Sequence, residues 1–403
     1  MSRQWVIVLA LAALFGLSLI WLLNQPVPDD EMAGGDLMLP ALNASVNQIQ
    51  AFDIVAPGGA VAVSLRRVGD ADQPDSMRWR VVQRDGYEAD FARVFSLLRD
   101  LADVQQAEPR TANSEWHARL GLQEMGQSEA SGRRLDFPLN EVPSILFGQV
   151  DPTGQGSYAR LQNNDQSWLL DRVIELPIDP VRWLEPGIMD IPSSDISEVI
   201  VRHADGEIVH VQNAGTEQDD FVLLDVPEDR EAGPAFRRTA LANGLRGLNL
   251  EDVRAFDPSL VPESATRAMF TTEDGLDFVV TLFAEGAENE SIDSEAPAGS
   301  AWWVHFSVSA ASEPDMDPAM TADEDPASSA LAADAPADNA AANVSDDSAS
   351  EAEANERLVN AVAVDARLSP WLFRISERKY NEMSVRMDDL LEPLPETEEA
   401  PVP

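Results

Sequence analysis

The chain has 403 residues, of which 44% are apolar and none is cysteine. This length predicts two or three domains, and the missing cysteine excludes disulfides, thiolate nucleophiles and cysteine-ligated metal centres. The 71 Asp and Glu outnumber the 28 Lys and Arg, so the formal net charge is -43. This charge argues against nucleic acid as a partner, because phosphates bind where cations neutralise them.

The first predicted element is an apolar helix near the amino terminus. Residues 5–23 contain neither a charge nor a proline over 19 positions, and a helix of that length reaches the roughly 30 Å of a bilayer core. A cleaved secretory signal is the alternative, but its apolar region usually has about 7 to 15 residues and an A-x-A-like site follows it. We therefore predict a transmembrane anchor in residues 1–24, followed by a linker in residues 25–45.

The charges beside this helix predict its orientation. Arg3 precedes the apolar run, and Asp29, Asp30 and Glu31 follow it. The positive-inside rule places the amino terminus in the cytoplasm. We therefore expect a single-pass protein of a bacterial inner membrane, with the bulk of the chain in the periplasm.

The remaining chain is predicted to form two similar α+β lobes in tandem. Residues 46–192 form the first repeat and residues 193–391 the second. Each begins with a predicted hairpin, in residues 49–68 and 196–212, because alternating apolar residues flank a Pro-Gly-Gly or Asp-Gly turn. The expected fold class is thus α+β, with mostly antiparallel sheet and packed helices.

Each hairpin is followed by a short strand and an amphipathic helix, in residues 89–104 and 233–250. Helical spacing predicts one buried stripe in the first helix, which consists of Phe91, Val94, Phe95, Leu98 and Leu101. The second helix carries a less regular stripe of Phe236, Leu241, Leu245 and Leu248. Further strands are expected in residues 133–139, 144–150 and 156–162 of the first repeat, and the corresponding strands of the second repeat in residues 275–283 and 301–309. The last predicted elements of each repeat are a strand that begins near a tryptophan and a helix.

An insertion is predicted inside the second repeat. Three matched pairs of positions are 147, 143 and 141 residues apart, whereas Trp168 and Trp371 are 203 apart. The surplus includes a tract from Ala310 to Glu356 with 13 acidic residues, 16 alanines, no basic residue and no aromatic residue. Such a composition cannot bury enough apolar area to offset backbone ordering. We therefore predict a disordered acidic insertion at about 310–357, and a disordered tail at 392–403.

The basic residues are unusual in kind, because Lys379 is the single lysine. A surface covered with carboxylates stays solvated in high salt, so the acidity is consistent with a salt-loving bacterium. The alternative is a genomic preference for arginine codons together with one acidic tail. Removing the 13 acidic residues of the Ala310–Glu356 tract from the net charge of -43 still leaves -30, so the acidity is global, which slightly favours a salt-loving source.

Several short motifs resemble a known family. An amino-terminal anchor, the hairpin, a W-R-V strand, the FARVFSLLRDL helix, the HARLGL segment, ILFG, YARL and WLLD together resemble the domain-of-unknown-function 4340 family of bacterial envelope proteins, over most of residues 46–391. Members typically occur beside gliding-motility-type ABC transporter components. The resemblance therefore implies an accessory protein of such a transporter, and it supplies no catalytic residue.

The sequence contains no residue that we assign as catalytic, cofactor-binding or metal-binding. A metal site at His203 and His210 is conceivable because both lie on one predicted hairpin, but no third ligand is near in sequence. His117 is expected to be structural, beside core residues Trp116 and Leu120. The chain lacks a phosphate-binding P-loop, which excludes the ATPase subunit of a transporter.

The other polar and aromatic candidates are explained by structural roles. Asp70, Asp72 and Asp75 lack the spacing of a calcium loop and are expected in a solvated hairpin loop. The pairs Arg133 and Arg134, or Arg237 and Arg238, are predicted to form internal ion pairs rather than an anion site. Of Trp302 and Trp303, one belongs to the core, and the other is either a partner-facing anchor or buried under a helix.

We therefore expect a non-enzymatic, membrane-anchored accessory or scaffold protein of an ABC-type transport system. Its expected partners are the inner membrane and an ABC transporter permease or its extracytoplasmic companion, and no cofactor is expected. The alternative is an extracytoplasmic binding module for a small ligand or an envelope polymer between the lobes. A hydrolase is the weakest alternative.

Overall fold

The computed structural model describes residues 35–69, 77–127, 129–215, 221–285, 301–311 and 343–393. The predicted anchor, residues 394–403 of the predicted tail and residues 312–342 of the predicted insertion lie outside this part. Among the described residues, no helix is both long enough and apolar enough to cross a bilayer.

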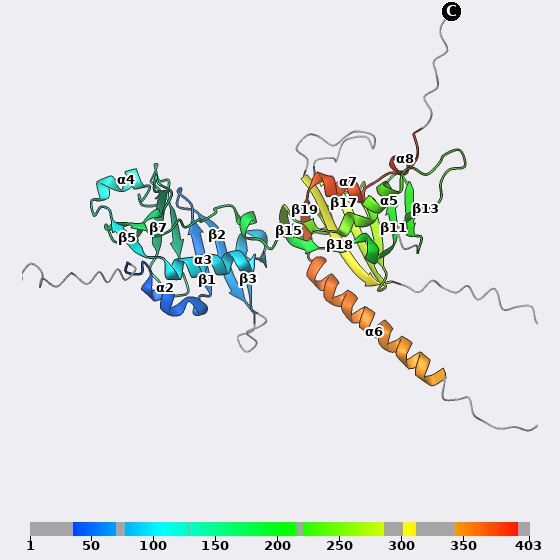
Figure 1. Ribbon diagram of the computed structural model, residues 1–403, viewed down its shortest axis with the longest axis horizontal. Helices are drawn as coiled ribbons and strands as arrows, with labels where there is room; N and C mark the ends of the chain where they lie inside the picture. Colours follow the sequence, from blue (N-terminus) through cyan, green and yellow to red (C-terminus); the bar gives the residue numbers. More distant parts are fainter. Residues whose placement is uncertain are drawn as a thin grey trace, which may run out of the picture. The chain divides into compact units, whose positions relative to one another are not determined.

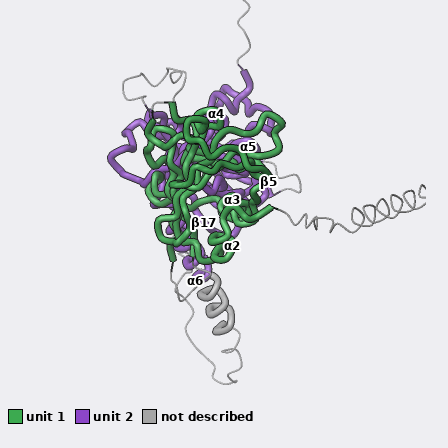
Figure 2. The backbone as a smooth tube through the Cα atoms, turned by 90° about the vertical axis from the view of Figure 1, so that its left-hand side faces the viewer, with its two compact units in different colours: residues 1–183 green, residues 184–403 purple. Residues whose placement is uncertain are grey.

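The chain divides into two compact units, residues 1–183 and 184–403, which are coloured separately in Figure 2. Each unit has a large antiparallel sheet with helices, as the α+β prediction requires. The division falls earlier than residue 193, where the sequence repeat places the start of the second lobe.

Unit 1 contains a nine-stranded sheet in the order β4-β3-β2-β1-β6-β7-β8-β9-β5. Its strands are β1 Ala51–Val55, β2 Val61–Val68, β3 Arg78–Val81, β4 Tyr87–Glu88, β5 Gln106–Pro109, β6 Arg133–Asp136, β7 Ile145–Val150, β8 Ser157–Leu161 and β9 Ser167–Leu170. Its α-helices are α2 Pro40–Ser45, α3 Phe91–Asp103 and α4 His117–Leu120, with short 3₁₀ turns at Val46–Gln48, Val82–Arg84, Ser114–Trp116 and Pro180–Trp183.

Unit 2 contains an eight-stranded sheet in the order β13-β12-β11-β16-β17-β18-β19-β15, and the pair β10-β14. Its strands are β10 Gly187–Met189, β11 Ile196–Arg202, β12 Ile208–Asn213, β13 Phe221–Leu223, β14 Leu248–Asn249, β15 Asp252–Ala255, β16 Thr266–Thr272, β17 Leu276–Glu285, β18 Ala301–Ala310 and β19 Trp371–Ile375. Its α-helices are α5 Ala235–Ala242, α6 Asn343–Leu368, α7 Glu377–Met383 and α8 Met387–Leu390, with 3₁₀ turns at Ser193–Asp195, Asn243–Leu245 and Pro258–Leu260.

The two large sheets have the same connectivity. Strands β3-β2-β1-β6-β7-β8-β9-β5 of the first correspond one for one to β13-β12-β11-β16-β17-β18-β19-β15 of the second. Helices α3 and α5 occupy equivalent places, because each leads from one edge of its sheet toward the strand at the other edge. This shared order is stronger evidence for an internal repeat than the sequence offsets.

The shared order also corrects the sequence alignment. The sequence pattern does not predict strand β16, which occupies the position in its sheet that β6 occupies in unit 1. Residues 275–283 therefore correspond to β7, and not to residues 133–139 as the sequence alignment predicts. The omission has a physical cause. The outward positions of β16 hold Arg267, Met269 and Thr271, and its inward positions include Thr266 and Thr272. The alternation of apolar and polar residues is therefore weak in the sequence.

The predicted linker is wrong over its second half. Met38 and Leu39 are buried, Leu42 of α2 is fully buried, and the Met38 N–H donates to the Val104 carbonyl oxygen over 2.9 Å. Residues 36–45 therefore belong to unit 1 and pack beside α3.

The predicted disordered insertion is also wrong at its end, because residues 343–357 lie in helix α6. The insertion does fall between neighbouring strands, β18 and β19. The carboxyl-terminal end of helix α6 lies beside β18, beyond the end of β19 (Figure 1), where Asp365 Oδ1 accepts from the Val308 N–H over 2.8 Å. Ala361 and Leu368 are buried, whereas most other side chains of residues 354–368 are exposed, so a few contacts hold this part of the helix.

Replacing Asp365 tests this attachment. The Asp365→Ala change leaves the buried Val308 N–H without its acceptor, so we expect the free energy of unfolding of unit 2 to fall by about 1–3 kcal/mol. Glu356→Ala, on the exposed part of α6, serves as the control and should change it by less than about 0.5 kcal/mol. Urea unfolding measures both, and equal effects would show that Asp365 does not anchor the helix.

Candidate functional site

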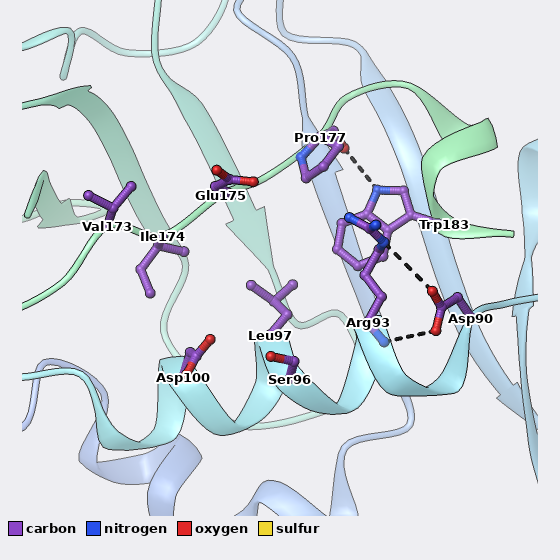
Figure 3. A pocket seen from close by; sticks show the side chains of 10 residues that line it. All are labelled: Asp90, Arg93, Ser96, Leu97, Asp100, Val173, Ile174, Glu175, Pro177 and Trp183. Atoms are coloured by element: carbon purple, nitrogen blue, oxygen red, sulfur yellow. Dashed lines mark hydrogen bonds and ion pairs between the residues drawn. The ribbon is translucent and has the colours of Figure 1, made fainter. Parts of the chain in front are cut away.

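A cleft runs along α3 in unit 1, with a volume of about 410 Å³ (Figure 3). One wall is α3, and the other is the segment after β9. The side chains that line it are Asp90, Arg93, Ser96, Leu97, Asp100, Val173, Ile174, Glu175, Pro177 and Trp183.

The start of α3 fixes one end of this cleft. Asp90 caps the helix, because its side chain accepts from the Arg93 N–H over 3.0 Å, and its own N–H donates to the Trp183 carbonyl oxygen over 2.8 Å. Trp183 is almost fully buried, and its indole N–H donates to the Pro177 carbonyl oxygen over 2.9 Å. The cleft therefore has a rigid wall on the side of Trp183.

The chemistry of this cleft is limited. Its charged lining consists of three carboxylates and one guanidinium, and its one hydroxyl, on Ser96, has no histidine in the lining to act as the base that acyl transfer would need. The open volume is sufficient for a small ligand, yet the acidic lining disfavours an anion.

A second cleft lies at the equivalent helix of unit 2, with a volume of about 730 Å³. Its lining comes from α5, α7, α8 and the segment between the last two, and consists of Phe236, Arg237, Ala240, Glu377, Arg378, Asn381, Glu382, Val385, Asp389 and Leu390. Arg237 Nη1 donates to the Asp389 carbonyl oxygen over 2.5 Å. Arg378 pairs with Glu382 over 2.5 Å, so both guanidinium groups already have partners.

The one lysine of the chain joins two of the helices beside this cleft, α7 and α5. Lys379 is buried, and its Nζ donates to the Asn243 carbonyl oxygen over 3.0 Å and pairs with Glu382 over 2.9 Å. A cation at the end of a helix satisfies carbonyl groups that lack intrahelical partners. Lys379 thus ties α7 to the end of α5.

The aromatic residues of α3 and α5 correct the predicted buried stripe. Val94, Leu98 and Leu101 are buried, but Phe91 is 65% exposed and Phe95 is 51% exposed. Their rings stack on the helix surface with centroids 5.9 Å apart. In α5, Phe236 is 68% exposed, so both equivalent helices present phenylalanine to solvent near their first residue.

The histidines do not form a metal site. His203 is buried, with Nε2 3.1 Å from the Val385 carbonyl oxygen, whereas His210 Nε2 is 2.6 Å from Glu198 Oε1. Odd and even positions point to opposite sides of a strand, and the hairpin register places the two rings on opposite faces of the sheet. Within the described residues, no three His, Cys, Asp or Glu side chains are grouped to hold a metal ion.

The remaining histidines have structural contacts. His117 is buried, with Nε2 2.9 Å from the Asp165 carbonyl oxygen, but the predicted core residue beside it, Trp116, is exposed. His305 Nε2 donates to the Ser369 carbonyl oxygen over 3.0 Å. Burial lowers the pKa of His305, although this hydrogen bond and Asp365 oppose the shift.

The predicted tryptophan and arginine candidates are mostly internal. Trp303 is buried and donates to Glu285 over 2.8 Å, while Trp302 packs on Tyr380 of α7 with centroids 4.3 Å apart. The helix layer therefore covers Trp302. Arg134 forms the predicted ion pair with Asp136, whereas Arg238 donates to backbone carbonyl groups instead. Asp70, Asp72 and Asp75 lie outside the described residues.

Comparison with protein families gives one match. Residues 79–267 match the model of a domain of unknown function, DUF4340. The chain contains a DUF4340 domain. The match begins in β3 of unit 1 and ends in β16 of unit 2, so the DUF4340 region crosses the boundary between the units and is shorter than the resemblance over residues 46–391. No curated protein and no solved structure matches the chain.

The exposure of the α3 phenylalanines predicts a contrast in stability. Leu98→Ala should lower the free energy of unfolding of unit 1 by about 2–5 kcal/mol, because it opens a cavity in the core. Phe95→Ala removes a larger ring but should change it by less than about 0.5 kcal/mol, apart from the weak stack on Phe91. Urea unfolding of the two variants decides the point, and a large loss for Phe95→Ala would place that ring in the core.

Proposed function

We propose that this protein is a membrane-anchored extracytoplasmic accessory or scaffold protein of an ABC-type transport system, without catalytic activity. Its partner would be a transporter permease or the permease's extracytoplasmic companion. The DUF4340 domain is consistent with this role, because the resemblance to that family implies a place beside transporter components.

The observation that carries the proposal is the shared exposure of phenylalanine on α3 and α5. Aromatic side chains bury much apolar area and dominate many protein interfaces. A largely exposed ring adds little to the stability of the free protein, and here it recurs at the start of the equivalent helix in both units. Because half or more of each ring surface is exposed in the free chain, contact with a partner explains these rings better than packing does.

The predicted anchor in residues 5–23 supports the same role. A protein held at the membrane meets another membrane protein at a high effective concentration, so a modest contact through a few aromatic residues suffices. The proposed topology places α3 and α5 on the periplasmic side of the inner membrane of a bacterium, where extracytoplasmic parts of a transporter would lie.

A binding module for a small ligand is the second candidate, favoured by the cleft of about 730 Å³ beside α5. Its apolar side chains, Phe236, Ala240, Val385 and Leu390, are flanked by charged groups, as is common in ligand sites. A ligand that binds the folded chain there would raise its melting temperature, and a partner-binding scaffold does not need such a ligand.

Pull-down from mild detergent tests the partner role. We expect the full-length protein to recover an ABC permease or its extracytoplasmic companion, and the variant Phe91→Ser, Phe95→Ser, Phe236→Ser to recover at least about tenfold less, since interface aromatics each contribute about 2 kcal/mol or more. The control replaces three other exposed apolar residues by serine, namely Leu139, Val222 and Leu260.

Two results would contradict the proposal. The first is that pull-down at low salt in mild detergent recovers the full-length protein without any transporter component. The second is equal recovery by the phenylalanine variant and the control variant, with both folded by circular dichroism.

A further inference from the structure

The outer face of the unit 2 sheet carries two arginines directly opposite each other. Arg202 of β11 pairs in register with Arg267 of β16, and both side chains are exposed. Directly opposed residues of antiparallel strands have Cβ atoms about 4.5–5.5 Å apart, and like charges there are destabilising. The free protein thus gains no stability from this arrangement.

These guanidinium groups have no acidic partner among the residues that the structure describes. Their neighbours in the same row across the sheet are Ile208 and Thr281. The carboxylates of Glu198 and Asp277 on these strands lie in a row four residues away, roughly 13 Å, and contact His210 and Thr271 respectively. In a chain with 71 acidic residues, an arginine pair without an acidic partner in the described part of the chain is a distinctive feature.

The adjacent row on this face is apolar. Ile200 pairs with Met269, and Met269 pairs with Val279, so the three side chains form a line about 10 Å long across the strands. All three are half-buried. Ile208, next to Arg202, is 47% exposed.

Unit 1 provides an internal comparison at the same place in the ladder. There Asp53 pairs in register with Asp136, and Val55 pairs with Arg134. Arg134 binds Asp136 with two nitrogens at 2.8 Å, and Asp53 forms an ion pair with Arg66 over 2.7 Å. Unit 1 thus neutralises its arginines, whereas unit 2 has Ile200 and Met269 where unit 1 has the two aspartates.

The two faces of this sheet are separate surfaces. His203 points toward the Val385 carbonyl oxygen, between α7 and α8. Its neighbour Arg202 therefore points to the opposite face. A site at Arg202 and Arg267 is distinct from the α5 cleft and from Phe236.

We propose that Arg202 and Arg267, together with the row Ile200, Met269 and Val279, bind an anionic amphiphile, with its acyl chain on the apolar row and its anionic head on the arginines. Guanidinium forks bind carboxylate and phosphate groups through paired hydrogen bonds. The apolar row offers an acyl chain a surface that requires no hydrogen bonds.

The backbone around the site favours an acyl chain over a peptide. Strands β11, β16 and β17 are each paired on both sides, so they have no free edge to which a peptide strand could add. A peptide on this face would leave its backbone bonded only to water, while an alkyl chain loses nothing by contact with Ile200 and Val279.

Calorimetric titration of the full-length protein with decanoate, below the concentration at which it forms micelles, tests the proposal. We expect saturable binding that Arg202→Gln with Arg267→Gln weakens about tenfold or more, which corresponds to the loss of one charge-assisted contact. Arg99→Gln with Arg246→Gln is the control, because it removes the same charge from exposed positions elsewhere and should leave decanoate binding unchanged.

Titrations with two further compounds test the contributions of the anionic head and of the acyl chain separately. Acetate has the anionic group without the chain, and decanol has the chain without the charge, and both should bind at least about tenfold more weakly than decanoate, since each forgoes one of the two contacts. Met269→Asp recreates the Arg134 and Asp136 spacing of unit 1, and should weaken decanoate binding even if the double arginine variant does not fold. Absence of saturable decanoate binding, equal binding by the arginine variant and its control, or acetate binding as tight as that of decanoate would overturn the proposal.

Discussion

Closure of each sheet by its last strand is the constraint on which both units depend. In unit 1, β9 lies between β8 and β5, and in unit 2, β19 lies between β18 and β15. The edge strands β5 and β15 are therefore attached to their sheets only through a strand that comes much later in the chain. Because β5 and β9 lie about 60 residues apart in the chain, and β15 and β19 about 120 residues apart, each large sheet is complete only when its final strand has been added.

This closure explains why unit 2 accommodates a long insertion. The entropic cost of closing a loop grows slowly with its length, and β19 gains pairing on two sides when it enters. Helix α6 then occupies the position beside β18 that β19 leaves open, with Asp365 as acceptor for an otherwise unpaired N–H. The insertion therefore adds a contact to the sheet edge without interrupting the strand order.

The sequence predicts those parts of the fold that have short, local patterns. The hairpins β1-β2 and β11-β12 carry alternating apolar residues around glycine turns, and both were found. The limits of such patterns are physical. Helical spacing identifies an apolar arc on α3 but not which side of that arc meets the sheet, so the pattern predicts Phe91 in the core. The attachment of α6 depends on a single hydrogen bond of Asp365, which an alanine-rich composition does not predict. The opposition of Arg202 and Arg267 depends on register between strands far apart in sequence, which no local pattern reports.

In the proposed function, the phenylalanines of α3 and α5 contact a transporter component at the membrane. The most direct measurement is photo-crosslinking in cells, with a photoreactive phenylalanine analogue at position 95 or 236 and, as a control, at position 139, followed by mass spectrometry of the products. We expect crosslinks to an ABC permease or its extracytoplasmic companion from positions 95 and 236, but not from position 139. Crosslinks to no transporter component, or the same products from position 139, would contradict the proposed function.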